Sequence, residues 1–138
     1  MTAEEADLSL AWTAGDTVVR WSDEAAGSAV EKHYARPPQA VVAWRQDGET
    51  LVLVIEALNI QPFTPVDNAV LYRADGSEMF RLSPPREMSS DPNAVFGFYT
   101  AHLGAEGVPV LVIATRAGDV QGRLDVRSGK VLDTRTWR

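Results

Sequence analysis

Two histidines are the residues of this 138-residue chain best suited to acid–base chemistry. Either imidazole, His33 or His102, could act as a general base if a carboxylate such as Asp91 or Glu106 oriented it. No spacing in the sequence requires such a pair. A small enzyme that uses a His–carboxylate pair is therefore one of three functional hypotheses, and we assign no catalytic residue.

The short motifs that mark common catalytic, nucleotide and metal sites are absent. The sequence contains no Gly-x-Ser-x-Gly nucleophile elbow, no Gly-x-x-x-x-Gly-Lys phosphate loop and no His-Glu-x-x-His zinc site. No stretch matches a calcium-binding EF-hand loop. The absence of cysteine excludes thiolate ligands and disulfides. We therefore predict no metal site and no cofactor.

The charge balance restricts the partners that the chain can attract. Lysine and arginine number 13 and aspartate and glutamate 19, so the net charge is −6 at pH 7. This charge repels nucleic acid and is compatible with a basic protein partner. Net charges of this size are also common in small soluble domains, so plain solubility is the simpler interpretation. No stretch approaches the roughly 18 apolar residues of a membrane span, and the first residues are acidic where a secretory signal is basic. We expect a soluble, cytoplasmic protein without membrane or nucleic-acid partners.

Five short turn signals divide the chain into runs rich in β-branched and aromatic residues, which is typical of consecutive β-hairpins. The signals are Asp47-Gly48, Asp75-Gly76, Gly104 to Gly107, Gly118-Asp119 and Ser128-Gly129. The predicted strands cover 17–21, 40–46, 50–57, 69–74, 78–82, 94–102, 109–115, 120–126 and 130–137. The length suits one domain over residues 1–138.

A helix is predicted over residues 23–35. Ser22 is a good N-cap, and the acidic residues Asp23 and Glu24 suit the positive end of a helix dipole. Apolar or aromatic positions then recur at helical spacing, namely Ala26, Ala29, Val30 and His33. We therefore predict an α+β fold, a predominantly antiparallel meander of about seven or eight strands with this helix packed on one sheet face. An all-β barrel or sandwich is the alternative.

Two predicted strands are apolar on both faces, Leu51–Ile55 and Val110–Ala114. A half-exposed antiparallel strand alternates instead, so a second layer must cover these strands. The helix predicted over 23–35 is one candidate cover, and a second copy in a homodimer is the other.

The longest predicted connections, 58–68 and 83–93, fall on the same end of a meander because successive connections alternate ends. Long loops in compact domains often carry function. This end presents the residues predicted to bind a partner or ligand: Gln61, Phe63, Arg86, Glu87, Met88 and Asp91. The alternative is that Phe63 and Met88 fold inward and fill the core.

The preferred functional hypothesis is a non-enzymatic protein-interaction module that binds a basic partner. An inhibitor, such as an immunity protein that neutralises a basic toxin, or a chaperone-like adaptor fits this description. The first alternative is a small-ligand-binding protein with a pocket at the end that bears loops 58–68 and 83–93. The second is the small enzyme with a His–carboxylate pair.

Overall fold

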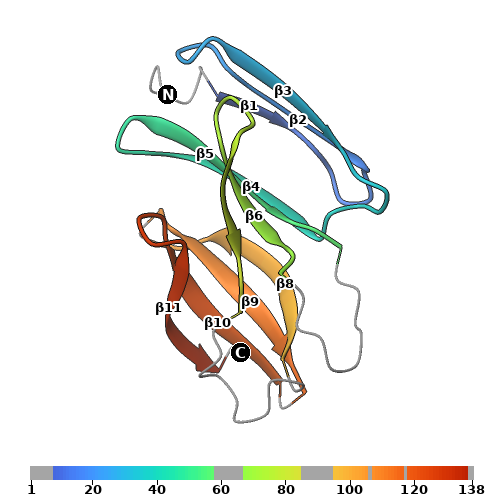
Figure 1. Ribbon diagram of the computed structural model, residues 1–138, viewed down its shortest axis with the longest axis vertical. Coiled ribbons are helices and arrows are strands. Elements are labelled where there is room, and N and C mark those ends of the chain that lie inside the picture. Colours follow the sequence, from blue (N-terminus) through green and yellow to red (C-terminus); the bar gives the residue numbers. More distant parts are fainter. Residues whose placement is uncertain (1–7, 58–66, 85–94, 106, 117, 137–138) are drawn as a thin grey trace.

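The computed structural model describes residues 8–57, 67–84, 95–105, 107–116 and 118–136. In these ranges the protein is all-β, with eleven strands in three antiparallel sheets and no helix (Figure 1). The prediction of an α+β fold is therefore wrong. The described part belongs instead to the all-β class, which is the class of the alternative prediction.

Each sheet is built from strands that are consecutive in the sequence. Sheet A has the order β1-β2-β3, with β1 Leu8–Ala11, β2 Val18–Asp23 and β3 Ser28–His33. Sheet B has the order β4-β5-β6-β7, with β4 Ala40–Gln46, β5 Glu49–Ile55, β6 Ala69–Arg73 and β7 Glu78–Leu82. Sheet C has the order β11-β10-β9-β8, with β8 Val95–Leu103, β9 Pro109–Thr115, β10 Gly118–Asp125 and β11 Lys130–Thr136.

The segment predicted as a helix, 23–35, forms a turn and a strand. β2 ends at Asp23, and β3 begins at Ser28 and pairs antiparallel with β2 along its whole length. The Asp23 side chain does cap a local structure, but it accepts the Ala26 N–H at 3.2 Å in a tight turn rather than at a helix start. Gly27 closes this turn with a positive φ of 67°, a conformation that glycine adopts readily.

The helical spacing in this segment was misleading because burial follows a period of two. Along β3 the side chains alternate between partly buried and exposed, and Ala29 and His33 lie on the exposed face. Of the four residues at helical spacing (Ala26, Ala29, Val30 and His33), Val30 is the one that packs inward, against the core that contains Trp21. Cross-strand pairing with β2 therefore outweighs the helical pattern of the isolated segment.

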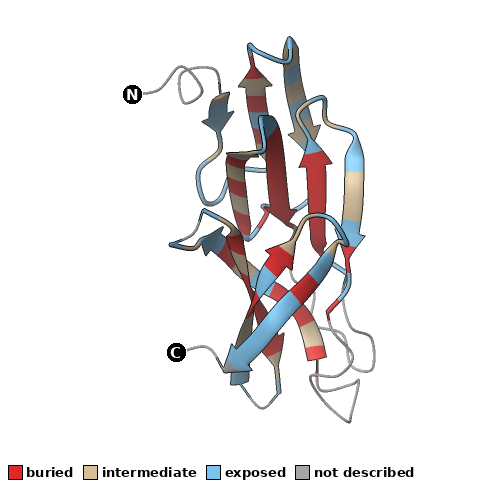
Figure 2. Cartoon of the chain, turned by 90° about the vertical axis from the view of Figure 1, so that its left-hand side faces the viewer, coloured by how far each residue is buried: buried red, intermediate tan, exposed pale blue. Residues whose placement is uncertain are grey.

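Sheet B is the middle layer, and both of its faces are covered (Figure 2). Leu53, Ile55 and Leu71 face sheet C in a core that includes Phe98 and Ile113. The alternating residues of β5 and β6 face sheet A in a second core, formed by Val19, Trp21, Val52, Val54, Val70 and Tyr72. The second face of β5, which is apolar on both faces, is thus covered by another β-sheet of the same chain. The homodimer stays a prediction.

A buried amide joins sheets B and C. Asn68 is 2% exposed, and its Oδ1 accepts the Phe98 N–H at 2.7 Å. Its Nδ2 donates to the carbonyls of Glu56 at 2.9 Å and Phe98 at 2.7 Å. Since a buried polar group needs partners, these three bonds fix how β6 approaches the edge strand β8.

Candidate functional site

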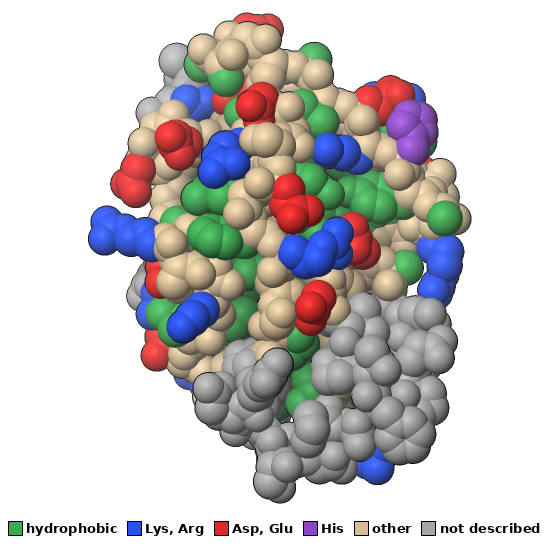
Figure 3. All heavy atoms as spheres, in the orientation of Figure 1, with side chains coloured by type: hydrophobic (Ala, Val, Ile, Leu, Met, Phe, Trp, Pro, Cys, Tyr) green, Lys and Arg blue, Asp and Glu red, His purple; other side chains and the backbone are tan. Residues whose placement is uncertain are grey.

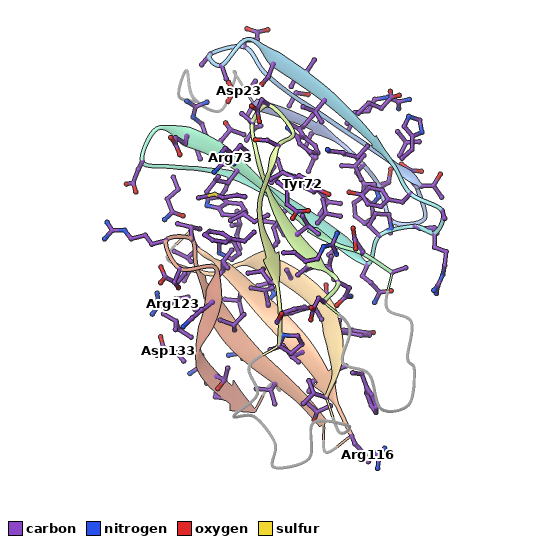
Figure 4. All side chains as sticks on the ribbon, viewed as in Figure 1. Asp23, Tyr72, Arg73, Arg116, Arg123 and Asp133 are labelled. Carbon is purple, nitrogen blue, oxygen red and sulfur yellow. The ribbon has the colours of Figure 1, made fainter. Side chains whose placement is uncertain are left out.

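Three hairpin turns meet at one end of the molecule. They are the β2–β3 turn at 24–27, the β4–β5 turn at 47–48 and the β6–β7 turn at 74–77. We call residues 23–28, 45–50 and 73–78 the turn end. Figure 1 shows these turns at the upper left, and Figure 4 labels Asp23 and Arg73 there.

Hydrogen bonds between layers hold the turn end together. The Ala74 carbonyl accepts from Trp21 Nε1 at 3.0 Å and from Ser28 Oγ at 3.0 Å. The Gly76 carbonyl accepts from Lys32 Nζ at 2.9 Å. The β6–β7 turn is therefore fixed against sheet A.

Glycine permits this close approach at Gly76. Its φ is +87°, and a Cβ at this position would lie 2.9 Å from Val30 Cγ1, so a larger residue would push the turn away from sheet A. Asp75 stabilises the same turn, because its Oδ1 accepts from the Ser77 N–H at 2.9 Å and from Ser77 Oγ at 2.6 Å. Those bonds lower the pKa of Asp75, the Ser77 hydroxyl contributing most.

A pocket of about 400 Å³ opens between the three turns. This volume lies within the range of roughly 300–1,000 Å³ that is usual for ligand pockets. Two carboxylates, Glu49 and Asp75, and two arginines, Arg45 and Arg73, contribute to the lining. The innermost lining residue that carries a charge is Asp23, which is 2% exposed.

Asp23 and Arg45 form an ion pair at the inner wall of this pocket. Arg45 Nη1 lies 3.3 Å from Asp23 Oδ2 and 3.3 Å from Thr50 Oγ1, and Nη2 donates to the Gly48 carbonyl at 3.3 Å. Charge-assisted bonds are usually shorter, at about 2.7–2.9 Å. Arg45 Nε is buried and makes no hydrogen bond. The guanidinium is therefore held by several long contacts rather than by one bidentate pair.

The surroundings of Asp23 favour its ionised form. A hydrogen bond from the Thr50 side chain is the largest cause that lowers the pKa of this carboxyl. Burial opposes the shift, while the Ala26 N–H and the positive charge of Arg45 add to it. The pocket thus keeps a buried negative charge at neutral pH.

The turn end also concentrates negative charge. Its charged residues are Asp23, Glu24, Arg45, Asp47, Glu49, Arg73, Asp75 and Glu78, which gives a net charge of −4 at pH 7. In the rest of the described residues up to 84, the charges balance: Asp16, Glu31, Glu56 and Asp67 against Arg20, Lys32, Arg36 and Arg81. Acidic side chains are visible at the upper left of Figure 3, where the turns lie.

The six predicted site residues, Gln61, Phe63, Arg86, Glu87, Met88 and Asp91, lie outside the described residues. The strand ends that flank the two long connections are described, and they lie together. Ile55 pairs with Ala69, and Ala69 pairs with Leu82. The starting points of both connections therefore lie at the same end of sheet B, as predicted, but the strand that follows the second connection, β8, belongs to sheet C rather than to the same meander.

One histidine meets a carboxylate, but at an exposed surface. His33 Nε2 lies 2.7 Å from Glu31 Oε2, and Arg20 Nε lies 2.6 Å from Glu31 Oε1. These side chains are about half to two-thirds exposed, at 67% for His33 and 47% for Glu31. Arg20 and His33 both lower the pKa of Glu31, Arg20 most strongly. His102 is exposed on β8. The described structure encloses neither imidazole in a cavity.

In the ranges that the structure describes, no group of three or more histidine, cysteine, aspartate or glutamate side chains is arranged to hold a metal ion. No helix in these ranges is long and apolar enough to cross a membrane. The sequence matches no protein-family model, and comparison with curated proteins finds no relative.

Sequence reasoning recognised the turns Asp47-Gly48 and Asp75-Gly76 but did not bring them together. The prediction also missed Asp23 as a pocket residue. It placed Asp23 at the start of a helix, whereas the residue ends β2 and lines the pocket. The strand alternation of Val19, Trp21 and Asp23 was the available signal, because it directs all three side chains to the same buried face.

Proposed function

We propose that this chain is a non-enzymatic binding module that recognises a basic protein partner through the turn end. The observation that carries the proposal is the local charge of −4, gathered on three turns around a pocket, with the β6–β7 turn bonded to sheet A and Arg45 of sheet B paired with Asp23. An inhibitor or immunity-type protein, or a chaperone-like adaptor, would use such a surface.

The physical argument has two parts. Clustered exposed carboxylates attract a basic partner over several ångströms and accelerate the encounter. Bonds such as Trp21 Nε1 to the Ala74 carbonyl hold the turns in place, so little conformational freedom is lost when the partner binds. The pocket between the turns then offers room for a lysine or arginine side chain of the partner, next to Glu49 and Asp75.

The experiment is affinity capture from a lysate of the source organism with three tagged proteins. The first is the wild type. The second removes four turn-end charges without changing side-chain shape: Glu24→Gln, Asp47→Asn, Glu49→Gln and Asp75→Asn. The third is a matched control with four similar changes elsewhere: Asp16→Asn, Glu31→Gln, Asp67→Asn and Asp119→Asn.

The expected result is one basic protein that binds the wild type and the control protein but not the turn-end variant. With the purified partner, the turn-end variant should bind at least about tenfold more weakly, since four charges contribute together. Raising the salt concentration should reduce the difference. Equal capture by all three proteins would show that the partner uses another surface, and capture of acidic proteins alone would contradict the proposal.

A further inference from the structure

A second open site lies on the outer face of sheet C. It is a groove of about 540 Å³ between the β8–β9 turn, the middle of β10 and the C-terminal half of β11. Val108 and Val110 supply an apolar part, and Gln121, Arg123, Asp133 and Arg135 supply polar groups. We call it the sheet C groove. It is separate from the turn end and is not part of the function proposed above.

The polar side chains of the groove are held by one another. Arg123 donates from Nη2 at 2.7 Å and from Nε at 3.1 Å to Asp133 Oδ2. Arg135 donates to the Gln121 amide oxygen from Nε at 2.8 Å and from Nη2 at 3.0 Å, in the amide orientation that satisfies both groups. Figure 4 shows Arg123 and Asp133 close together beside β11. The two guanidinium groups are thus positioned in advance on neighbouring strands.

A β-bulge creates this arrangement. Gln121 pairs with Arg135, whereas Arg123 pairs with Leu132, so β11 contains one extra residue in this interval. Asp133 lies in the bulge with a φ of +56°, a conformation that non-glycine residues rarely adopt. Bulges and strained residues of this kind often redirect side chains at binding sites. Here the bulge directs the Asp133 carboxylate to Arg123.

The described residues of sheet C carry a net positive charge although the protein is acidic. Sheet C and its described connections carry Arg116, Arg123, Arg127, Lys130 and Arg135 against Asp119, Asp125 and Asp133, a net charge of +2. Within the groove, Asp133 offsets the charge of Arg123, and Arg135 adds one positive charge. Among the described residues, Gln121 is the hydrogen-bond partner of Arg135, and it engages Nε and Nη2 but not Nη1.

We propose that the sheet C groove binds a small oxyanion ligand. A carboxylate or phosphate group of the ligand accepts hydrogen bonds from Arg135, which supplies the positive charge beside the Arg123–Asp133 pair, and the apolar part of the ligand lies on Val108 and Val110. The groove is concave, and its polar side chains come from the neighbouring strands β10 and β11, which suits a small molecule better than a broad protein surface.

The test is isothermal titration of the full chain with two probes, pyrophosphate and citrate, at constant ionic strength. At least one probe should bind, and the tighter one tells whether phosphate or carboxylate is preferred. Arg135→Gln should weaken that binding at least about tenfold. Asp133→Asn should strengthen probe binding, because the substitution removes a negative charge from the groove. Asparagine still tolerates the left-handed backbone at this position. Arg116→Gln, in the β9–β10 turn and outside the groove, should leave the affinity within about twofold of the wild type.

Two outcomes would overturn the proposal. The first is that neither pyrophosphate nor citrate binds. If polyglutamate binds where these small anions do not, the groove binds an acidic protein partner instead. The second is that Arg116→Gln weakens binding as much as Arg135→Gln, which would indicate general charge attraction. If Arg135→Gln fails to fold, Arg135→Lys keeps the charge without the planar guanidinium, and it should still lose binding severalfold.

Discussion

At the scale of single residues, Asp23 serves two structures with one carboxylate. Its Oδ1 caps the β2–β3 turn through the Ala26 N–H, and Oδ2 pairs with Arg45 on sheet B. The side chain is 2% exposed. Since a buried charge without its partner is unfavourable, this carboxylate links the stability of the turn to the contact between sheets A and B.

We expect Asp23→Ala to destabilise the protein by about 2–3 kcal/mol, because it removes a cap and leaves Arg45 partly buried without its ion pair. The measurement is the free energy of unfolding in urea. Asp16→Ala is the matched control. Asp16 also accepts a backbone N–H, that of Thr13 at 3.1 Å, but it lies at an exposed turn, and its loss should destabilise by less than about 1 kcal/mol. Equal effects would show that the Arg45 pair contributes nothing.

The lowered pKa of Asp23 predicts a pH dependence of stability. The folded-state pKa lies below the ordinary value of 3.8, so the folded state favours the ionised form. The resulting stabilisation is present above that value and is lost as the pH falls through the folded-state pKa. The advantage of the wild type over Asp23→Asn should therefore be constant from pH 7 to about pH 5 and shrink toward pH 3. Urea midpoints across this range measure it, and an advantage that grows in acid would contradict the assignment.

At the scale of elements, the strands of sheets B and C could be predicted and the fold of 23–35 could not. The ranges 40–46, 78–82 and 109–115 agree with the structure to the residue, because turn signals bound each of them on at least one side. In 23–35 the same residues satisfy a helical period and a strand period. The choice depends on Trp21 and Val30 packing against sheet B, which is remote in sequence.

The candidate site was hidden for the same reason. A turn such as Asp47-Gly48 can be recognised from two residues, and Asp47 indeed has the positive φ of 53° that this turn requires. Which turns then meet depends on how sheet A lies on sheet B. No local pattern reports that Ser28 and Trp21 bond to the Ala74 carbonyl, 46 and 53 residues away.

The junction between sheets B and C gives a prediction for an element contact. Asn68→Ala removes three hydrogen bonds and leaves the buried Phe98 N–H without its partner. We expect a loss of about 2–4 kcal/mol in the free energy of unfolding. Gln39→Ala is the control, because Gln39 also bonds β8, through the Tyr99 carbonyl, but at an exposed site. Its loss should be below about 1 kcal/mol, and similar losses in both variants would argue against a special role for Asn68.

At the scale of the whole molecule, the middle sheet belongs to two cores at once. Leu53 contributes to the core with sheet C, while the adjacent Val52 and Val54 contribute to the core with sheet A, and all three are completely buried. A strand cannot leave one core without disturbing the other. The layers should therefore unfold together, although among the described residues sheet A packs on sheet B through one of its faces.

This coupling can be tested at Trp21, the largest side chain in the core between sheets A and B. Trp21→Ala should destabilise the whole chain by about 3–5 kcal/mol, as expected for a large buried aromatic residue. Unfolding should remain a single transition, so that far-ultraviolet circular dichroism and the fluorescence of the remaining tryptophans give the same urea midpoint. Trp12→Ala, at a partly buried site on the rim of the same core, should cost about 1–2 kcal/mol. Two separate transitions in Trp21→Ala would show instead that sheet A unfolds alone. The turn end would then be lost before sheets B and C, because its pocket needs Asp23 from sheet A and Arg45 from sheet B.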